Sequence, residues 1–394
     1  MNEQNRLLEF AIKHPETILQ LISGHHNISE QLIEKYSDKW LWEGYVSLSR
    51  NANLRWSIDF IDRYKDKLDW ERLNYYNRHL PWSIELVEKF IDKWDWKKLS
   101  RNPWIPWTIE FIEKYKDKWL WGYTEGSGIN RICGLSMNSS LPWSEVFFEM
   151  YADKWDWEGL SANIPWSIVQ IEKYKEKWNW KKLSQNHNLP WSTYLLDFYE
   201  EKWDWNFLSL NESLPWSDRF MENYKDKWNW GNLSSNRALP WSVEFIRKNK
   251  WNWYRLSENP SLPWSINLII MFEKMWDWKA LGRNKSLPWS IELIEKFADK
   301  WDWKSIVFGA SVPFSVEFIE KHKDKFDDVT PAGTHLPWNG LTRNCYLPWS
   351  LNLIEKYEDK WNWNVIGENQ SIYEKIFKPY LTDDLVDKIM QIIR

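Results

Sequence analysis

One motif recurs along most of this chain, and it constrains the fold more than any other feature. A representative copy is segment 287–303, LPWSIELIEKFADKWDW. We number each copy from its first tryptophan, or the residue in that place, as position 0; the commonest step between copies is about 25 residues. Such a period is typical of a repeat array, in which each unit packs only on its neighbours. Thirteen copies begin at Ile28, Trp56, Trp82, Trp107, Trp143, Trp166, Trp191, Trp216, Trp241, Trp264, Trp289, Phe314 and Trp349.

Each copy predicts a pair of short helices. Position 1 is Ser or Thr in every copy, as at Ser290, and a hydroxyl there can cap a first helix, helix A. Apolar positions 5, 8 and 12, such as Ile294, Phe297 and Trp301, form one stripe and extend helix A over about eleven residues. Asp or Asn at position 13, as at Asp302, predicts the cap of a second helix, helix B.

Helix B is expected to end near a recurrent Asn at position 20, as in Asn186 and Asn236. Asparagine tolerates the left-handed backbone conformation that often stops a helix, so we expect that conformation here. A Leu-Pro step then leads into the next copy, and proline cannot continue a helix. The sequence therefore predicts an all-α fold, an α-solenoid of about thirteen Trp-rich helical hairpins of roughly 25 residues.

The two ends of the chain depart from the motif. Residues 1–27 predict two short amphipathic helices broken at Pro15 and Gly24, and residues 364–394 predict a final amphipathic helix. We expect degenerate caps at both ends because a repeat array needs a polar outer face at its termini. The predicted organisation is an N-terminal helical cap (1–27), a helical-repeat array (28–363) and a C-terminal helical cap (364–394).

The 36 tryptophans follow from the repeat, which has three tryptophan positions, 0, 12 and 14. Positions 0 and 5, and positions 12 and 17, have the spacing of a hydrophobic staple, which fixes the angle at which a chain enters a helix. Two of the three tryptophans therefore have a structural interpretation. The exposure of the position-14 tryptophan does not follow from the sequence.

Composition narrows the class of function. The formal net charge of −4 argues against nucleic-acid binding, which usually needs a basic face, although a lysine column at position 11 leaves it as an alternative. Two cysteines and the absence of a signal-peptide pattern favour the cytoplasm, and no apolar run is long enough to span a membrane. No catalytic motif is present, and no cofactor or resident metal is expected. The shape resembles that of tetratricopeptide and HEAT proteins, but the motif matches neither, so no function follows from it.

Interruptions of the repeat are the predicted binding elements. Insertions near 122–134 and 327–337 both fall between helix A and helix B, so they should project from one edge, where repeat-specific loops often bind ligands. The Trp241 copy also loses two residues within helix A, for which we expect only a change of local curvature. Candidate binding residues in the insertions and irregular copies are Tyr123, Glu125, Arg131, Phe308, Asp328, His335 and Arg343.

The sequence thus favours a non-catalytic scaffold that recognises a protein partner through its concave face and two same-edge loops. Variable helix-B positions 15, 16 and 19, such as Lys97, Lys98 and Arg101, would carry specificity. The competing hypothesis is a metal-dependent or other enzymatic site around residues 306–345. His and carboxylate side chains there could bind a divalent metal, although His322 stands where other copies have an aromatic residue and is expected to pack as one.

Overall fold

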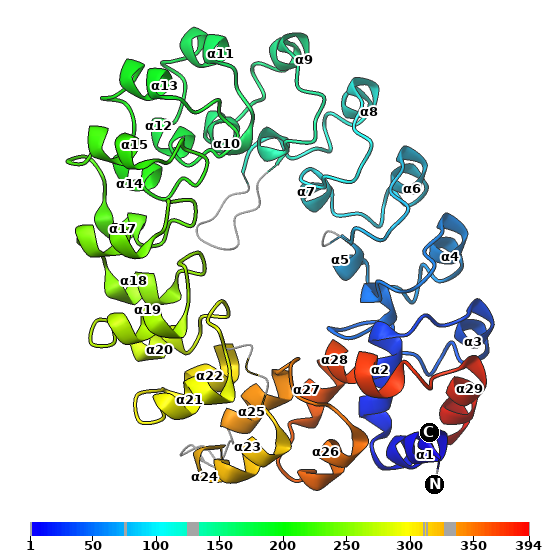
Figure 1. Ribbon diagram of the computed structural model, residues 1–394. Helices are drawn as coiled ribbons and strands as arrows, with labels where there is room; N and C mark the ends of the chain where they lie inside the picture. Colours follow the sequence, from blue (N-terminus) through cyan, green and yellow to red (C-terminus); the bar gives the residue numbers. More distant parts are fainter. Residues whose placement is uncertain are drawn as a thin grey trace. The chain divides into compact units, whose positions relative to one another are not determined.

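The computed structural model describes residues 2–74, 77–123, 134–309, 312, 314–326 and 336–393, without the side chains of residues 308, 309, 326, 336 and 337. In these ranges the chain consists of short helices and connecting turns with no β-strand, as the sequence predicts (Figure 1). None of these helices is both long and apolar enough to cross a lipid bilayer. The chain divides into two compact units, unit 1 (1–73 and 264–394) and unit 2 (74–263).

Unit 1 contains the first and last helices of the chain. Its helices are α1 (Glu3–Lys13), α2 (Pro15–His25), α3 (Glu30–Lys35), η1 (Leu48–Arg50), α4 (Ile58–Arg63), α5 (Trp70–Leu73), α19 (Ile266–Met271), α20 (Trp278–Leu281), α21 (Ile291–Lys296), α22 (Trp303–Gly309), α23 (Val316–Lys321), α24 (Lys323–Phe326), α25 (Leu336–Arg343), α26 (Leu351–Lys356), α27 (Trp363–Glu368), α28 (Gln370–Ile372), the π-helical turn η4 (Tyr373–Phe377) and α29 (Asp383–Ile392).

Unit 2 contains the central copies of the motif. Its helices are α6 (Ile84–Lys89), α7 (Trp96–Leu99), α8 (Ile109–Lys114), η3 (Leu135–Met137), α9 (Glu145–Met150), α10 (Trp157–Asn163), α11 (Ile168–Lys173), α12 (Trp180–Leu183), α13 (Thr193–Phe198), α14 (Trp205–Leu208), α15 (Asp218–Asn223), α16 (Trp230–Leu233), α17 (Val243–Lys248) and α18 (Trp253–Glu258).

Helix A begins where the sequence predicts and ends earlier. In the described chain it starts directly after the Ser or Thr of position 1, and that side chain accepts a hydrogen bond from a backbone amide in every copy except the first, at Ser29. The predicted length of about eleven residues is wrong, because the α-helical part covers six. The residue at position 8, such as Tyr199, leaves the helical conformation, and a tight turn carries the chain to position 12.

The position-13 caps of helix B are confirmed. The carboxylate of Asp204 accepts from the amides of Asn206 and Phe207, and the side chain of Asn179 accepts from the amide of Lys182. The tie to the previous copy comes from a buried serine, because the amide of Asp204 donates to Ser184 Oγ at 2.9 Å.

The left-handed stop predicted at position 20 is wrong. Asn259, for example, has φ −71° and ψ 119°, which is extended backbone. These asparagines are buried, and several of their side chains connect neighbouring copies: Asn211 Nδ2 donates to the carbonyls of Ser184 and Asn186 at 3.1 and 3.2 Å, while its Oδ1 accepts from the amide of Ser213. Asparagine is favoured here because one side chain can satisfy several buried backbone groups.

All three tryptophan positions are structural. Each of the three positions has a recurrent backbone acceptor for its indole N–H: Trp191 at position 0 donates to Asn186 O, Trp178 at position 12 to Ile171 O, and Trp180 at position 14 to Lys175 O. The rings form a group across each junction between copies, as where Trp203 packs on Trp191 of its own copy at 5.1 Å and on Trp180 of the preceding copy at 4.9 Å. The position-14 tryptophan is therefore the aromatic link between copies.

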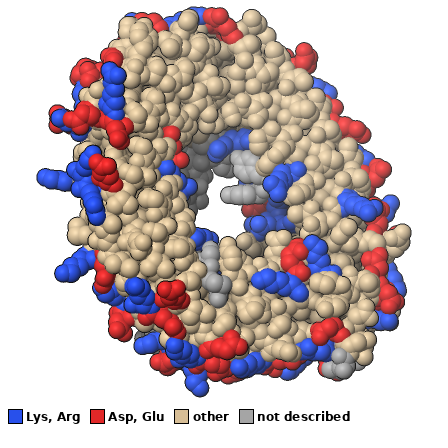
Figure 2. All heavy atoms as spheres, in the orientation of Figure 1, with Lys and Arg blue, Asp and Glu red and all other residues tan. Residues whose placement is uncertain are grey.

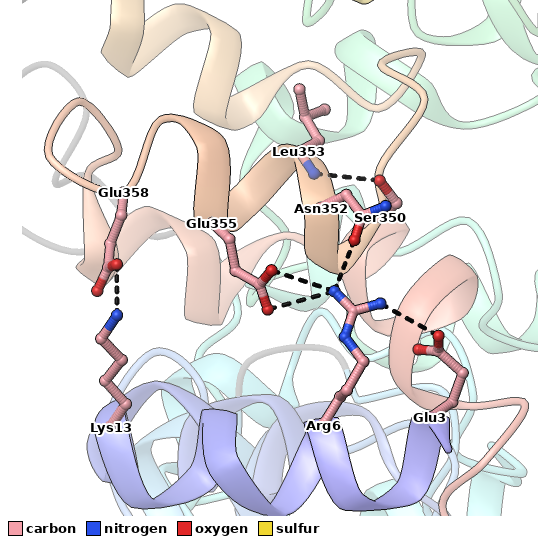
Figure 3. Close-up of polar contacts among 8 residues, drawn as sticks. All are labelled: Glu3, Arg6, Lys13, Ser350, Asn352, Leu353, Glu355 and Glu358. Atoms are coloured by element: carbon pink, nitrogen blue, oxygen red, sulfur yellow. Dashed lines mark hydrogen bonds and ion pairs between the residues drawn. The ribbon is translucent and has the colours of Figure 1, made fainter. Parts of the chain in front are cut away.

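The two terminal segments of unit 1 pack against each other. Helix α2 lies against α27 and α1 against α29. Arg6 donates to Asn352 and Glu355, at 2.7 Å and 3.1 Å, and Lys13 pairs with Glu358 at 2.5 Å (Figure 3). The imidazole of His14 stacks on Trp363 with ring centroids 3.7 Å apart. Segments 1–27 and 364–394 thus cover each other within one compact unit.

Candidate protein-binding surface

Five of the seven binding residues predicted from the insertions and irregular copies have no described side chain. Glu125, Arg131, Asp328 and His335 lie outside the described residues, and Phe308 belongs to α22 without a described side chain.

The two remaining candidates have local structural contacts. The Tyr123 hydroxyl, in unit 2, lies 3.1 Å from Met137 Sδ. Arg343, in unit 1, pairs with Glu368 at 3.7 Å and is exposed. Neither contact involves the rest of the predicted set, so these two residues carry no binding site by themselves.

His322 packs as the sequence suggests. Its ring lies 5.0 Å from Trp303 and 4.5 Å from Phe318, in the place that tyrosine takes in other copies. Burial lowers the pKa of His322, so the neutral imidazole is favoured. Among the residues that the structure describes, no three His, Cys, Asp or Glu side chains gather as metal ligands would.

The strongest surface feature was not among the predicted residues. Five large apolar side chains are exposed on the A helices of three consecutive copies in unit 2, and we call them the apolar patch. They occupy positions 3 and 7 of α9, position 3 of α11, and positions 3 and 7 of α13. The members and their exposed fractions are Val146 (71%), Met150 (51%), Val169 (76%), Tyr194 (61%) and Phe198 (58%).

Other copies carry opposite charges at the same two positions. Position 3 is acidic and position 7 basic in α6, α8, α21 and α23, and these side chains are exposed; the pairs are Glu85 and Lys89, Glu110 and Lys114, Glu292 and Lys296, and Glu317 and Lys321. The apolar patch therefore replaces a solvated, charged surface rather than extending a core. This contrast could have been found by aligning the copies, because the signal is a loss of charge at two positions.

Contacts between the helices hold the patch together. The ammonium group of Lys173 in α11 reaches back to Glu145 and Glu149 of α9 at 2.8 and 3.0 Å. Between α11 and α13, the hydroxyl of Tyr199, the residue that follows α13, donates to Glu172 of α11. The rings of Tyr194 and Phe198 stack on each other at 5.8 Å. The patch is thus presented on three helices fixed by side-chain bonds.

A charged border accompanies the patch. The Tyr174 hydroxyl and the Lys173 ammonium both bond to Glu149 and hold the pKa of its carboxyl below the ordinary value. Glu149 therefore remains ionised beside Met150. An apolar centre with a charged rim is the composition expected of a protein interface.

Charge elsewhere on the surface is mixed. On the face drawn in Figure 2, Lys and Arg side chains lie among Asp and Glu side chains. Many are paired between copies, as are Lys114 with Glu88 and Lys227 with Glu200. Of the three variable helix-B residues named above, Lys97 and Arg101 are exposed, whereas Lys98 is half-buried and pairs with Asp95 at 3.8 Å.

Comparison of the chain with protein-family models, with curated proteins and with solved structures gives no match.

Proposed function

We propose that this protein is a non-catalytic α-solenoid of about thirteen helical hairpins that binds a protein partner through the apolar patch on α9, α11 and α13. The observation that carries the proposal is the exposure of five large apolar side chains at positions that hold charged residues in other copies. Large exposed apolar side chains on neighbouring helices lower solubility, and a group of them is typical of an interaction site.

The proposal keeps the class of function suggested by the sequence and moves the contact surface. A concave face and two same-edge loops were the expected surfaces, and both insertions fall largely outside the described residues. The patch spans three helices at interaxial spacings of about 8–10 Å, so it is roughly 20 Å long. This length suits the centre of a standard protein–protein interface, with the charged border around it.

Restoring the regular charge pattern tests the proposal. The patch variant combines Val146→Glu, Val169→Glu and Tyr194→Glu, which places the usual acidic residue at position 3 of each helix. Its control lowers the net charge by the same three units at exposed position 15 of helix B, through Lys97→Gln, Lys181→Gln and Asn206→Asp. Both sets change exposed side chains, so both proteins should remain folded by circular dichroism.

We expect affinity capture with mass spectrometry to recover specific partners with the native chain and the helix-B variant, and to lose them with the patch variant. Light scattering on the same three proteins identifies the case in which the partner is a second copy. Loss of partners with the helix-B variant alone would assign binding to the other face. Identical capture with all three proteins would remove the proposal.

A further inference from the structure

A cavity of about 600 Å³ lies beside the shortened Trp241 copy of unit 2. The cavity lies between α15 and α17, and its walls include Met221, Glu222, Trp230 and Phe245. Its size falls within the range of about 300–1,000 Å³ found for ligand pockets. A similar hollow of about 670 Å³ lies between α13 and α15 of the regular preceding copy, beside Tyr224. The deletion was expected to affect local curvature only, and the difference that accompanies it is in the lining, which in the shortened copy includes the ring of Trp230 and the side chain of Met221.

The regular copies show what fills this place. In the preceding copy the position-8 residue is Tyr224, and its ring packs on Trp205 at 5.2 Å, Phe220 at 5.3 Å and Trp228 at 5.9 Å. The Tyr224 hydroxyl donates to Asp197, the position-6 acid of the copy before, at 2.5 Å. Tyr115, Tyr151, Tyr174, Tyr199 and Tyr357 make the same kind of hydroxyl-to-carboxylate bond.

The Trp241 copy lacks this tyrosine. Two residues are missing between Lys248 and Trp251, so no ring occupies position 8. In this copy, the residues that correspond to the four neighbours of Tyr224 are Trp230, Phe245, Trp251 and Glu222. Of these, Trp230, Phe245 and Glu222 line the cavity. Within the described chain, Trp251 is the one aromatic ring packed on Trp230, at 5.2 Å.

The layer around the cavity is otherwise intact. Trp251 still packs on Trp241 at 4.9 Å and on Phe245 at 5.4 Å, and its indole N–H still donates to the carbonyl at position 5, that of Ile246. The amide of Asn252 still donates to Ser234 Oγ at 2.9 Å. The deletion has therefore removed the tyrosine without displacing the groups that would contact it.

The carboxylate that would accept a hydrogen bond from the missing tyrosine is still present, as Glu222. In two complete copies the position-6 glutamate divides its oxygens: Glu113 Oε1 binds Lys116 and Oε2 binds Tyr151, and Glu172 uses Lys175 and Tyr199 in the same way. Glu222 Oε1 binds Lys225 at 2.8 Å. No described donor bonds to Glu222 Oε2, the oxygen that takes the tyrosine hydroxyl elsewhere.

We infer that this cavity receives a tyrosine side chain of the protein partner, with its ring against Trp230 and its hydroxyl donating to Glu222. The repeat indicates the ligand, because the three preceding copies fill the equivalent place with Tyr174, Tyr199 and Tyr224, while the following copy has Phe272 there. A cavity larger than one phenol ring favours a tyrosine within a polypeptide over a free phenol. The inference rests on the proposed function for the nature of the partner, but it uses a different copy from the apolar patch.

The test uses the full chain labelled with ¹⁵N-tryptophan, in which the Trp230 indole resonance is assigned with a Trp230→Phe variant. The probes are p-cresol, toluene and a hexapeptide with one central tyrosine. We expect saturable shifts at Trp230, at least tenfold weaker binding of toluene than of p-cresol, and tighter binding of the peptide than of p-cresol. Glu222→Ala should weaken p-cresol binding and leave toluene binding unchanged.

Two length-matched variants supply the decisive control. Replacing Asn249 and Lys250 by Tyr-Lys-Asp-Lys restores the regular spacing and should abolish binding of every probe. Replacing them by Ala-Lys-Asp-Lys restores the spacing without the ring and should preserve binding. The inference is overturned if the tyrosine-filled variant still binds, if toluene equals p-cresol, or if p-cresol binds as tightly as the peptide.

The patch variant separates this inference from the proposed function. It should bind the tyrosine peptide normally, because its substitutions lie outside the residues that line the cavity. Normal peptide binding together with unchanged partner capture would refute the patch alone. Loss of capture with no peptide binding to the native chain would refute the cavity alone.

Discussion

The exposed faces of helix A differ between α21 and α23 of unit 1 and α9 and α13 of unit 2. All four helices begin at a capping serine and bury an aromatic or leucine side chain at position 4 and an apolar one at position 5. At positions 3 and 7, however, the first pair carries Glu and Lys, whereas the second carries Val, Met, Tyr and Phe. The residues that stabilise the fold and those that we propose for recognition therefore occupy different positions of the same short helix, and they can be changed independently.

The largest expected difference is between a buried and an exposed aromatic residue of one copy. Trp203→Ala should lower the free energy of unfolding by about 3–5 kcal/mol, because Trp203 is buried and packs on Trp180 and Trp191. Phe198→Ala, on the exposed face, should change it by less than about 0.5 kcal/mol. Urea denaturation followed by circular dichroism measures both, and equal losses would contradict the separation of the two faces.

The second-largest change in the free energy of unfolding is expected from the asparagine contacts between copies. Asn211→Ala removes two bonds to carbonyls of the preceding copy and leaves the buried carbonyl of Ser184 without this donor, which costs about 1–3 kcal/mol. The control is Asn223→Ala, which removes an exposed amide at the end of α15 and should be nearly neutral. If both substitutions have the same effect on the urea midpoint, the asparagines do not stabilise the junctions.

A smaller effect is expected from single hydroxyl groups near α13. Tyr199→Phe removes the bond to Glu172 and should lower the free energy of unfolding by about 1 kcal/mol. Tyr194→Phe, in the apolar patch, should leave it unchanged, because that ring is exposed. Thermal unfolding of the two variants compares them directly. A loss at Tyr194 would mean that the exposed face also supports the fold.

Much of this framework could be predicted from the sequence, because its signals are local. The serine and aspartate caps, such as Ser192 and Asp204, act within three residues of themselves, so spacing alone identifies them. The roles of Asn211 and Ser184 could not be predicted, because their partners lie in a neighbouring copy. The sequence shows that Asn and Ser recur at these positions, but it does not show which atoms of the neighbouring copy they bond to.

The apolar patch was not predicted from the sequence. The predicted binding residues lie in insertions and irregular copies, as do His335 and Arg343, whereas the apolar patch lies in copies of regular helix-A length. Whether Val169 or Phe198 belongs to the core or to an exposed patch depends on its exposure. The sequence shows which face of a helix is exposed only when the length and orientation of that helix are known. The cavity beside Trp230 required still more, because it depends on which ring is missing between two copies.

The smallest predicted effect is a difference between the two units in how their stability depends on pH. Three histidines of unit 1, His14, His25 and His26, have pKa values lowered by burial, and His26 Nδ1 lies 2.9 Å from the Tyr373 hydroxyl. The two described histidines of unit 2, His79 and His187, are exposed. Below about pH 6.5 the unfolded chain therefore binds more protons than folded unit 1.

It follows that the stability from these neutral histidines is complete above about pH 6.5 and declines as pH falls towards their folded pKa values. Lowering the pH from about 7.5 to 5.5 should increase hydrogen exchange in α2 and α27 more than in α13 and α14, after correction for the intrinsic rate. A His26→Gln variant should show a smaller pH response in unit 1, because it removes one of the titrating groups. Equal responses in both units would mean that the packing between the terminal segments does not depend on neutral imidazoles.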